Sequence, residues 1–164
     1  PRINENLAIK RFSEQSSTRG CYGPSGGNDG YKTGDTLKET CIGMSLTNLE
    51  KNPWWQVDLA TTPMVGKVIV YPRTEFQDMD GFRLTNFRII VSKNPFPSGS
   101  EIPKASADTW LSDLVSAKSP YNNIMTVNVP DDTFGRYVRI QIEGDNKALD
   151  LAELEVFPNE KITR

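Results

Sequence analysis

Two tryptophans stand side by side in Asn52-Pro53-Trp54-Trp55-Gln56-Val57-Asp58-Leu59. Successive side chains of a β-strand point to opposite faces of a sheet, so one of Trp54 and Trp55 must face inward and the other outward. A packed tryptophan buries about 150–250 Å² of surface. We therefore predict that both rings are packing residues, and that Asp58 is a structural residue of a loop or turn.

On both sides of this stretch, strong sequence periodicity has a period of two, which is typical of strands. The predicted strands are residues 67–71, 87–91, 125–129, 137–142 and 152–156. In the last of these, the alternation sends Glu153 and Glu155 to the side opposite the core set. Since the only tolerable helix is a short one around Ala107 to Val115, the pattern predicts an all-β jelly-roll β-sandwich, with residues 1–164 as a single domain.

Residues 19–52 break the alternation, because they are rich in Gly, Ser, Thr, Asn and Asp. A long loop without secondary structure usually has a function, or is held by something other than a core. A metal, a disulfide or ligand contacts could hold it. Disorder is the alternative, but Trp54, Trp55 and Leu59 follow immediately and must pack.

The composition excludes several kinds of function. The chain has no histidine, which removes Ser-His-Asp and Cys-His catalysis and HExxH zinc chemistry, so a metal would need oxygen ligands or the two thiols. The 19 basic residues are balanced by 21 acidic ones, which argues against a nucleic-acid partner. Mean hydropathy is −0.50, and no stretch approaches the roughly 18 apolar residues of a membrane helix.

Several short segments, taken in order, resemble the F-type lectin (fucolectin) family, part of the discoidin and coagulation-factor C-type galactose-binding-like superfamily. They are residues 6–8 with 15–18, 28–30, 52–59, 135–138 and 151–156. The resemblance implies a jelly roll with long loops at the ligand-binding end. It also implies a carbohydrate-recognition module rather than an enzyme.

The resemblance implies a structural calcium ion (Ca²⁺) held by oxygen ligands. The matching positions are the carbonyls of Gly26, Tyr31 and Ala152, the carboxylates of Asp29 and Glu153, and the carbonyl and hydroxyl of Thr40. The spacing from Asp29 to Thr40 fits the family without a gap. An ion there would explain how so polar a loop becomes rigid; solvated turn residues are the alternative.

The family grips fucose with one histidine and two basic residues. Arg73 and Arg83 match the two basic positions, and Glu75 replaces an aspartate that would orient the first arginine. The histidine position holds Gly43, which has no side-chain donor. Because losing such a donor costs about 1–3 kcal/mol, we expect an altered or lost fucose site. For Arg73, the alternative is an arginine without a ligand role.

Adjacent cysteines pack beneath the sugar in the family, and residues 76–82 replace them here. An apolar platform for a sugar face could come instead from Phe76, Phe82, Met79 and Tyr22, with Asp78 or Asp80 accepting from hydroxyls. These residues complete the predicted sugar site.

The two cysteines depart from the family's pattern. The family bridges the position of Cys41 to the residue before the closing glutamate, which is Ala152 here, and Cys21 has no clear counterpart. A Cys21–Cys41 bridge would close about 20 residues and contribute about 3 kcal/mol. Two free thiols are the alternative.

Two functions remain open from the sequence. The first is a calcium-containing, fucolectin-like recognition module that is secreted or extracellular and binds a fucosylated or related glycan, or a cell-surface glycoprotein. The second is a discoidin-type adhesion module that no longer binds sugar. Carboxylate pairs such as Asp78 with Asp80 are better explained by a loop than by glycosidase chemistry. Homo-oligomerisation and a multidomain parent stay open.

Overall fold

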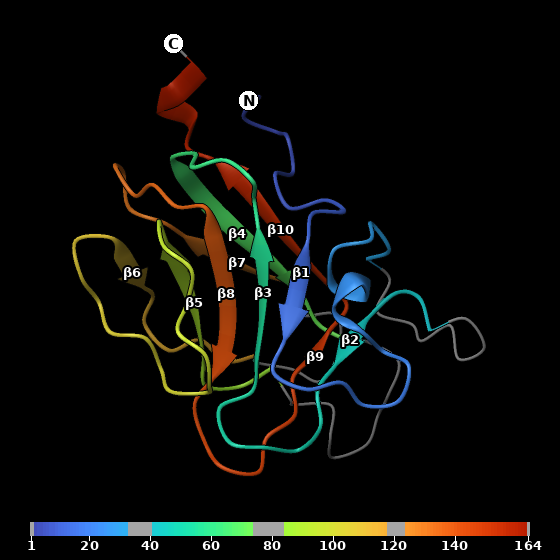
Figure 1. Ribbon diagram of the computed structural model, residues 1–164. Coiled ribbons are helices and arrows are strands. Elements are labelled where there is room, and N and C mark those ends of the chain that lie inside the picture. The colour runs from blue at the N-terminus through green and yellow to red at the C-terminus, as the bar shows by residue number, and fades with distance from the viewer. Residues whose placement is uncertain (1, 33–40, 74–83, 118–123, 164) are drawn as a thin grey trace.

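The computed structural model describes residues 2–32, 41–73, 84–117 and 124–163. They form a β-sandwich of two antiparallel sheets (Figure 1). The first sheet contains β1 (Ser13–Gln15), β3 (Trp54–Asp58), β8 (Tyr137–Ile142), β5 (Phe87–Ser92) and β6 (Thr109–Leu111), in that order. The second contains β10 (Glu153–Pro158), β4 (Val65–Tyr71) and β7 (Met125–Asn128). A short pair, β2 (Ser45–Leu46) with β9 (Asp150–Leu151), lies beside them. The all-β jelly-roll prediction and all five predicted strands are confirmed.

The core fills the space between the two sheets. Alternate residues of β3 and β8 face it, with Trp55 opposite Ile140 and Val57 opposite Val138. From the other sheet Leu154 lies opposite Val70. All of these side chains are buried, as a period of two requires when one face of each sheet is covered.

The predicted short helix around Ala107 to Val115 is wrong. Residues Thr109–Leu111 form β6, which pairs along β5 with Trp110 opposite Val91. Edge pairing and apolar contact outweigh the local helix propensity of this segment. In the described part of the chain, the helical residues are two 3₁₀ turns, η1 (Pro24–Gly27) and η3 (Glu160–Thr163).

The tryptophan pair packs as predicted. Trp55 is fully buried in the core. Trp54 faces the outer side of the sheet, where the guanidinium of Arg139 lies 4.2 Å from its ring and 4.4 Å from the ring of Phe96. Asp58 is the last residue of β3, rather than a loop residue, and it accepts from the backbone N–H of Ala60 (2.8 Å) just after the strand, so its predicted structural role is confirmed.

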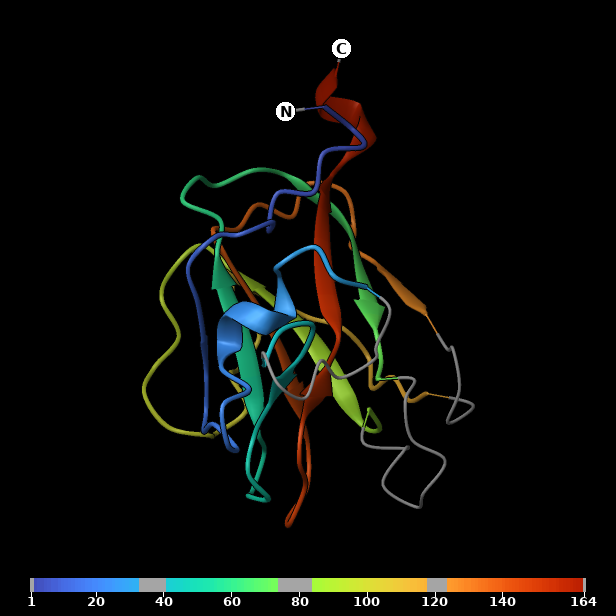
Figure 2. The same ribbon diagram turned by 90° about the vertical axis from the view of Figure 1, so that its right-hand side faces the viewer.

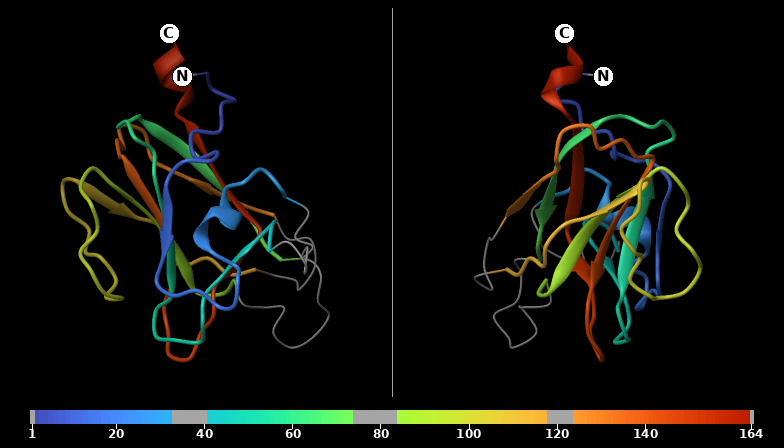
Figure 3. Two further views of the ribbon diagram at one scale, coloured as in Figure 1. Left: turned by 45° about the vertical axis from the view of Figure 1, so that its right-hand side comes forward. Right: turned by 90° about the vertical axis from the view of Figure 1, so that its left-hand side faces the viewer.

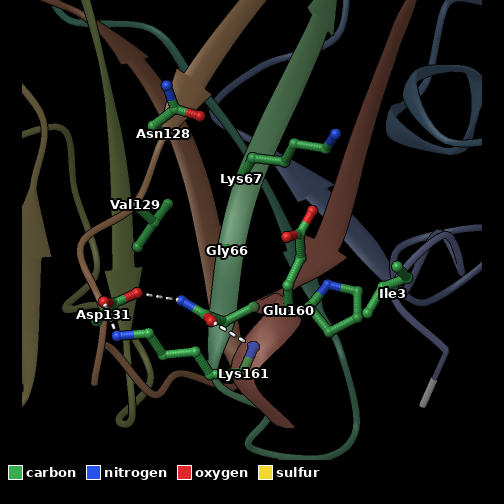
Figure 4. A pocket seen from close by; sticks show the side chains of 10 residues that line it. Ile3, Gly66, Lys67, Asn128, Val129, Asp131, Glu160 and Lys161 are labelled. Atoms are coloured by element: carbon green, nitrogen blue, oxygen red, sulfur yellow. Dashed lines mark hydrogen bonds and ion pairs between the residues drawn. The ribbon is translucent and has the colours of Figure 1, made fainter. Parts of the chain in front are cut away.

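The two ends of the sandwich differ. Figures 2 and 3 show both chain termini at one end, with the connection between β8 and β9 at the other. The terminal end carries a hollow of about 330 Å³ (Figure 4). Three of its polar side chains bond to one another, because Asp131 accepts from both Asn159 (2.8 Å) and Lys161 (2.5 Å). This network holds η3 against the sandwich.

Candidate functional site

A buried carboxyl group marks the predicted metal region. Glu153 opens β10 and is fully buried. Its Oε2 accepts from the backbone N–H of Gly30 (2.8 Å), whereas Oε1 has no hydrogen-bond donor among the described residues. Burial, aided by the nearby Asp29 carboxylate, raises the pKa of Glu153 to about 9. A lone buried carboxylate is costly, so this position calls for a proton or a cation.

Asp29 supplies the second carboxylate. Its Oδ1 accepts from the backbone N–H of Tyr31 (3.0 Å), and its Oδ2 from that of Gly43 (3.1 Å). The Asp29 carboxylate is near enough to Glu153 to help raise the pKa of Glu153. Residues 124 positions apart in the chain thus bring two acidic groups together, an arrangement that a cation between them would stabilise.

The residues present fit a hard cation. Of the six predicted ligands, five lie in the described part of the chain, and Thr40 lies outside it. Gly26, Asp29 and Tyr31 line one cleft of about 370 Å³, while Ala152 directly precedes Glu153. The described residues contain no cluster of three or more His, Cys, Asp or Glu side chains suited to a metal. Ligands beyond the two carboxylates would therefore be carbonyl or hydroxyl oxygens, which is the donor set that calcium prefers.

The predicted tryptophan stretch and the predicted metal loop are in direct contact. The indole N–H of Trp55 donates to the carbonyl of Pro24 (2.8 Å). A Cβ at Gly27 would lie 2.7 Å from that indole nitrogen, and one at Gly26 would lie 2.1 Å from the carbonyl oxygen of Met44. Only glycine lets η1 approach both elements this closely, so the core tryptophan positions the loop.

Asn28 fastens the loop to the N-terminal segment. Its buried side-chain amide donates to the carbonyls of Ala8 (2.8 Å) and Arg11 (2.9 Å). Its own carbonyl accepts from the backbone N–H of Lys10 (2.8 Å). Lys10 and Arg11 are thereby held in place, and both line the cleft that Asp29 lines.

The disulfide prediction is confirmed, since Cys21 and Cys41 are bridged. The bridge ties the two described parts of the polar loop, residues 19–32 and 41–52, to each other. Cys41 also lines the cleft beside Asp29. This crosslink differs from the family's pattern, in which position 41 pairs near the C-terminus.

Glu155, two residues after Glu153, has side-chain hydrogen-bond donors on both of its carboxylate oxygens. The Tyr71 hydroxyl donates to it (2.7 Å), and so does the Lys32 ammonium (3.2 Å). The hydrogen bond to Glu155 raises the pKa of Lys32, and burial followed by Glu155 raises that of Tyr71. Both glutamates lie on the strand face opposite Leu154, as predicted, but the polar loop covers that face instead of solvent.

Arg73 is the one predicted sugar-binding arginine whose position is described. It follows β4, and its side chain is 21% exposed. Its Nη1 lies 3.5 Å from Oδ2 of the buried Asp150 on β9. The orienting role that the sequence assigned to Glu75 is thus filled, among the described residues, by Asp150. Glu75, Phe76 and Arg83 lie outside the described residues, as do Phe82, Met79, Asp78 and Asp80.

Tyr22, the remaining predicted sugar residue, is hydrogen-bonded to the short β2–β9 pair that carries Asp150. Its carbonyl accepts from the backbone N–H of Leu46 (3.1 Å) and from the side chain of Gln15 (3.0 Å). Leu46 pairs with Asp150 in the β2–β9 ladder. Tyr22 and Arg73 therefore both bond to the β2–β9 pair, Tyr22 through Leu46 and Arg73 through Asp150, although they lie about fifty positions apart in the chain.

Gly43, which stands at the predicted histidine position, contributes its backbone to the site. Its φ is 97°, in the region that favours glycine, and its N–H donates to Asp29. A side chain at position 43 would strain the backbone that delivers this donor. Position 43 therefore serves as a backbone donor to Asp29.

Sequence reasoning missed Asp150, Lys32 and Tyr71. Their neighbours come from segments 77, 123 and 84 residues away, and no local pattern encodes such pairs. Within the described residues, no helix is long and apolar enough to cross a membrane.

The NedA-like, galactose-binding domain profile matches residues 27–140. The chain belongs to this family. Among solved structures, a fucose-binding module of Streptococcus pneumoniae is 28% identical, with a TM-score of 0.72, over 93% of this chain and 97% of that one. The lectin domain of lectinolysin, solved with Lewis B antigen, is also 28% identical, with a TM-score of 0.73, over 96% and 99%.

A fucolectin from Morone saxatilis (striped bass) serum shares the fold. It is 24% identical, with a TM-score of 0.74, over 94% of this chain and 48% of that one. No curated protein is similar enough to count as a relative. The predicted family resemblance is confirmed, and the chain is a lectin-like module of the galactose-binding-like type.

Proposed function

We propose that this chain is a carbohydrate-recognition module that takes a fucosylated or related glycan beside Arg73, above a calcium ion bound at Asp29 and Glu153. The proposal is supported by membership of a galactose-binding domain family and by similarity to modules described as binding fucose and Lewis B antigen. The observation that carries it is the Arg73–Asp150 pair. A buried carboxylate fixes a partly exposed guanidinium at the β2–β9 end of the sandwich.

The chemistry follows from that pair. A guanidinium presents several N–H donors in a rigid plane, and these can bond sugar hydroxyls or a ring oxygen. Asp150 would hold the plane in place and lower the entropy lost when a sugar binds. Since Gly43 offers no side-chain donor, we infer that the grip differs from that of the family and selects a related sugar or a larger oligosaccharide.

The calcium proposal rests on Oε1 of buried Glu153, which has no hydrogen-bond partner among the described residues, and on the nearby Asp29 carboxylate. The ion would neutralise the carboxylate pair and fix η1. The residues proposed to hold it are those named above, including Thr40. The disulfide favours an oxidising compartment, so we propose a secreted or cell-surface location.

A glycan array with added calcium, and one with chelator, tests the proposal. We expect binding to fucosylated or galactose-containing structures that Arg73→Ala weakens about tenfold or more. Arg2→Ala is the matched control, because Arg2 is exposed at the terminal end. Equal binding by both variants would refute the Arg73 site.

A second candidate is the discoidin-type adhesion module. Tyr31 and Ile42 line the cleft beside Asp29, and both are exposed, at 53% and 38%. Phe12, on the neighbouring segment, is 69% exposed. Apolar tips of this kind suit a protein or membrane surface. A blank glycan array together with retained cell binding that Tyr31→Ser reduces would favour this function.

A further inference from the structure

A second hollow lies beside edge strand β6. Figure 1 shows this strand at the opposite edge of the five-stranded sheet from β1 and η1. The volume of the hollow is about 330 Å³, at the lower end of the usual range for small-molecule pockets, about 300–1,000 Å³. The lining residues that matter for recognition are Trp110, Phe134, Lys93, Asp108, Thr109 and Asp132. None of them belongs to the site proposed above.

The hollow is built by a close approach of two backbones. A Cβ at Gly135 would lie 2.3 Å from the Val91 side chain and 3.1 Å from the carbonyl oxygen of Ser92. The N–H of Arg136 donates to that same carbonyl (2.9 Å). Residues 132–134 are thereby held against β5, so Phe134 and Trp110 contribute to one concave surface.

Asp108, one of the polar residues of the hollow, has contacts on both its backbone and its side chain. Asp108 lies at a tight turn, and its N–H donates to the Ser106 hydroxyl (3.2 Å). Its carboxylate accepts from Asn94 (3.4 Å) and lies 3.7 Å from the ammonium of Lys93. The side chains of Asp108 and Lys93 are about half exposed, at 50% and 45%. They are accessible to a ligand, and their mutual contact favours one arrangement of the two charges.

This mixture of groups selects among ligand classes. Two carboxylates, from Asp108 and Asp132, outnumber the one ammonium, so an anion is disfavoured. The partly exposed Trp110 and the 40% exposed Phe134 give apolar area that an ion would not use. A neutral ring with one apolar face and several hydroxyls matches both features, because hydroxyls can donate to carboxylates and accept from an ammonium or the indole N–H.

We propose that this hollow is a second carbohydrate subsite, which takes one pyranose unit of a glycan. Carbohydrate as the ligand class rests on the proposed function, but the subsite uses different residues from the opposite edge of the sheet. The module would then contact glycans at two separated places, so that two branches or two chains engage it together and binding to a dense glycan surface is strengthened.

The three tryptophans make the test direct. The indole N–H of Trp55 donates to Pro24 in η1, that of Trp54 donates to Gly99 on the covered outer face, and Trp110 lines the hollow. In ¹⁵N-labelled protein each gives one indole signal, assignable through Trp110→Phe and Trp54→Phe. We would titrate wild type and Arg73→Ala with a Lewis B oligosaccharide and, separately, with galactose.

We expect the Trp110 signal to shift with at least one of these sugars and to keep shifting in Arg73→Ala. Phe134→Ala should weaken the affinity reported by Trp110 about tenfold. Leu114→Ala is the matched control, since Leu114 is 46% exposed and does not line the hollow. Asp108→Asn should weaken the same affinity severalfold.

The outcomes separate the two proposals. A Trp110 signal that moves with neither sugar overturns the second subsite, whatever the array shows for Arg73. A Trp110 shift that disappears in Arg73→Ala overturns it as well, since one site would then explain both. Equal effects of Phe134→Ala and Leu114→Ala also contradict it. A Trp110 shift in a protein whose array binding ignores Arg73 would uphold the subsite and refute the Arg73 site.

Discussion

Gly30 donates its backbone N–H to the buried carboxyl group of Glu153, 2.8 Å away in space and 123 positions away in the chain. This hydrogen bond satisfies Oε2 only, and Oε1 is left without a donor among the described residues. The adjacent Asp29 adds a second acidic group. The contact therefore joins the polar loop to β10 at the point where a cation would stabilise both.

Calcium should raise the stability of the protein through Glu153. At a free calcium concentration one hundred times the dissociation constant, the free energy of unfolding should rise by about 2.7 kcal/mol. Glu153→Gln should abolish this rise, as measured by thermal unfolding across a calcium titration. Glu143→Gln, just after β8 of the five-stranded sheet, should keep it; an equal response in both variants would argue against the site.

Removing the disulfide should lower the free energy of unfolding by about 3 kcal/mol, because the crosslink closes a loop with a sequence separation of 20. Urea unfolding of the double variant Cys21→Ala, Cys41→Ala measures the loss. Reducing agent should destabilise the wild type to the same extent and leave the double variant unchanged. A reductant effect on the double variant would show that the loss comes from elsewhere.

The Asp58–Arg136 pair should make stability depend on pH in the acidic range. Two hydrogen bonds, of 2.7 and 3.0 Å, join the carboxylate to the guanidinium, and the hydrogen bonding by Arg136 lowers the pKa of Asp58. A lowered folded-state pKa contributes stability above the unfolded value, near 3.8, and this stability is lost as the pH falls through the folded value.

Asp58→Asn should therefore be less stable than wild type at pH 6, and the difference should shrink below about pH 4. Urea unfolding at several pH values measures it. Asp113→Asn serves as control, since Asp113 is exposed. A difference that stays constant from pH 6 to pH 2 would contradict the linkage.

Arg139 should be the most costly arginine to remove from the sheet. It is 1% exposed, lies between the rings of Trp54 and Phe96, and donates to the side-chain carbonyls of Gln56 and Gln141. Burial lowers its pKa to about 10, so it still carries its charge at neutral pH. Arg139→Ala should lower the free energy of unfolding by about 2–4 kcal/mol, from lost cation–π contacts and hydrogen bonds.

Arg88→Ala is the matched control on the neighbouring strand. Arg88 pairs with the partly exposed Glu143, and such pairs contribute about 0–1 kcal/mol. Chemical unfolding of both variants compares the two losses. Equal losses would show that the position of Arg139 between the two rings adds nothing to the free energy of unfolding.

The sequence by itself determined the sandwich. Alternation located β4, β5, β7, β8 and β10, because a period of two follows directly from strand geometry. It also indicated which tryptophan environment to expect, one ring in the core and one outside. It failed at Ala107 to Val115, where pairing of β6 along β5 overrode a local preference.

For the acidic pair and the disulfide, the sequence indicated the residues and the structure established their arrangement. Asp29, Glu153, Cys21 and Cys41 were all predicted from the sequence, by resemblance or by spacing. The structure confirmed the disulfide, and it alone revealed that Glu153 is buried near the Asp29 carboxylate. Burial depends on what covers a strand face, and here the polar loop covers it.

Only the tertiary structure decided the partners of Arg73 and the existence of the hollow at Trp110. Asp150 reaches Arg73 from 77 residues away, and Phe134 reaches the hollow because Gly135 lets two backbones meet. Such contacts depend on how sheets stack and loops cross, and side-chain periodicity carries no information about either.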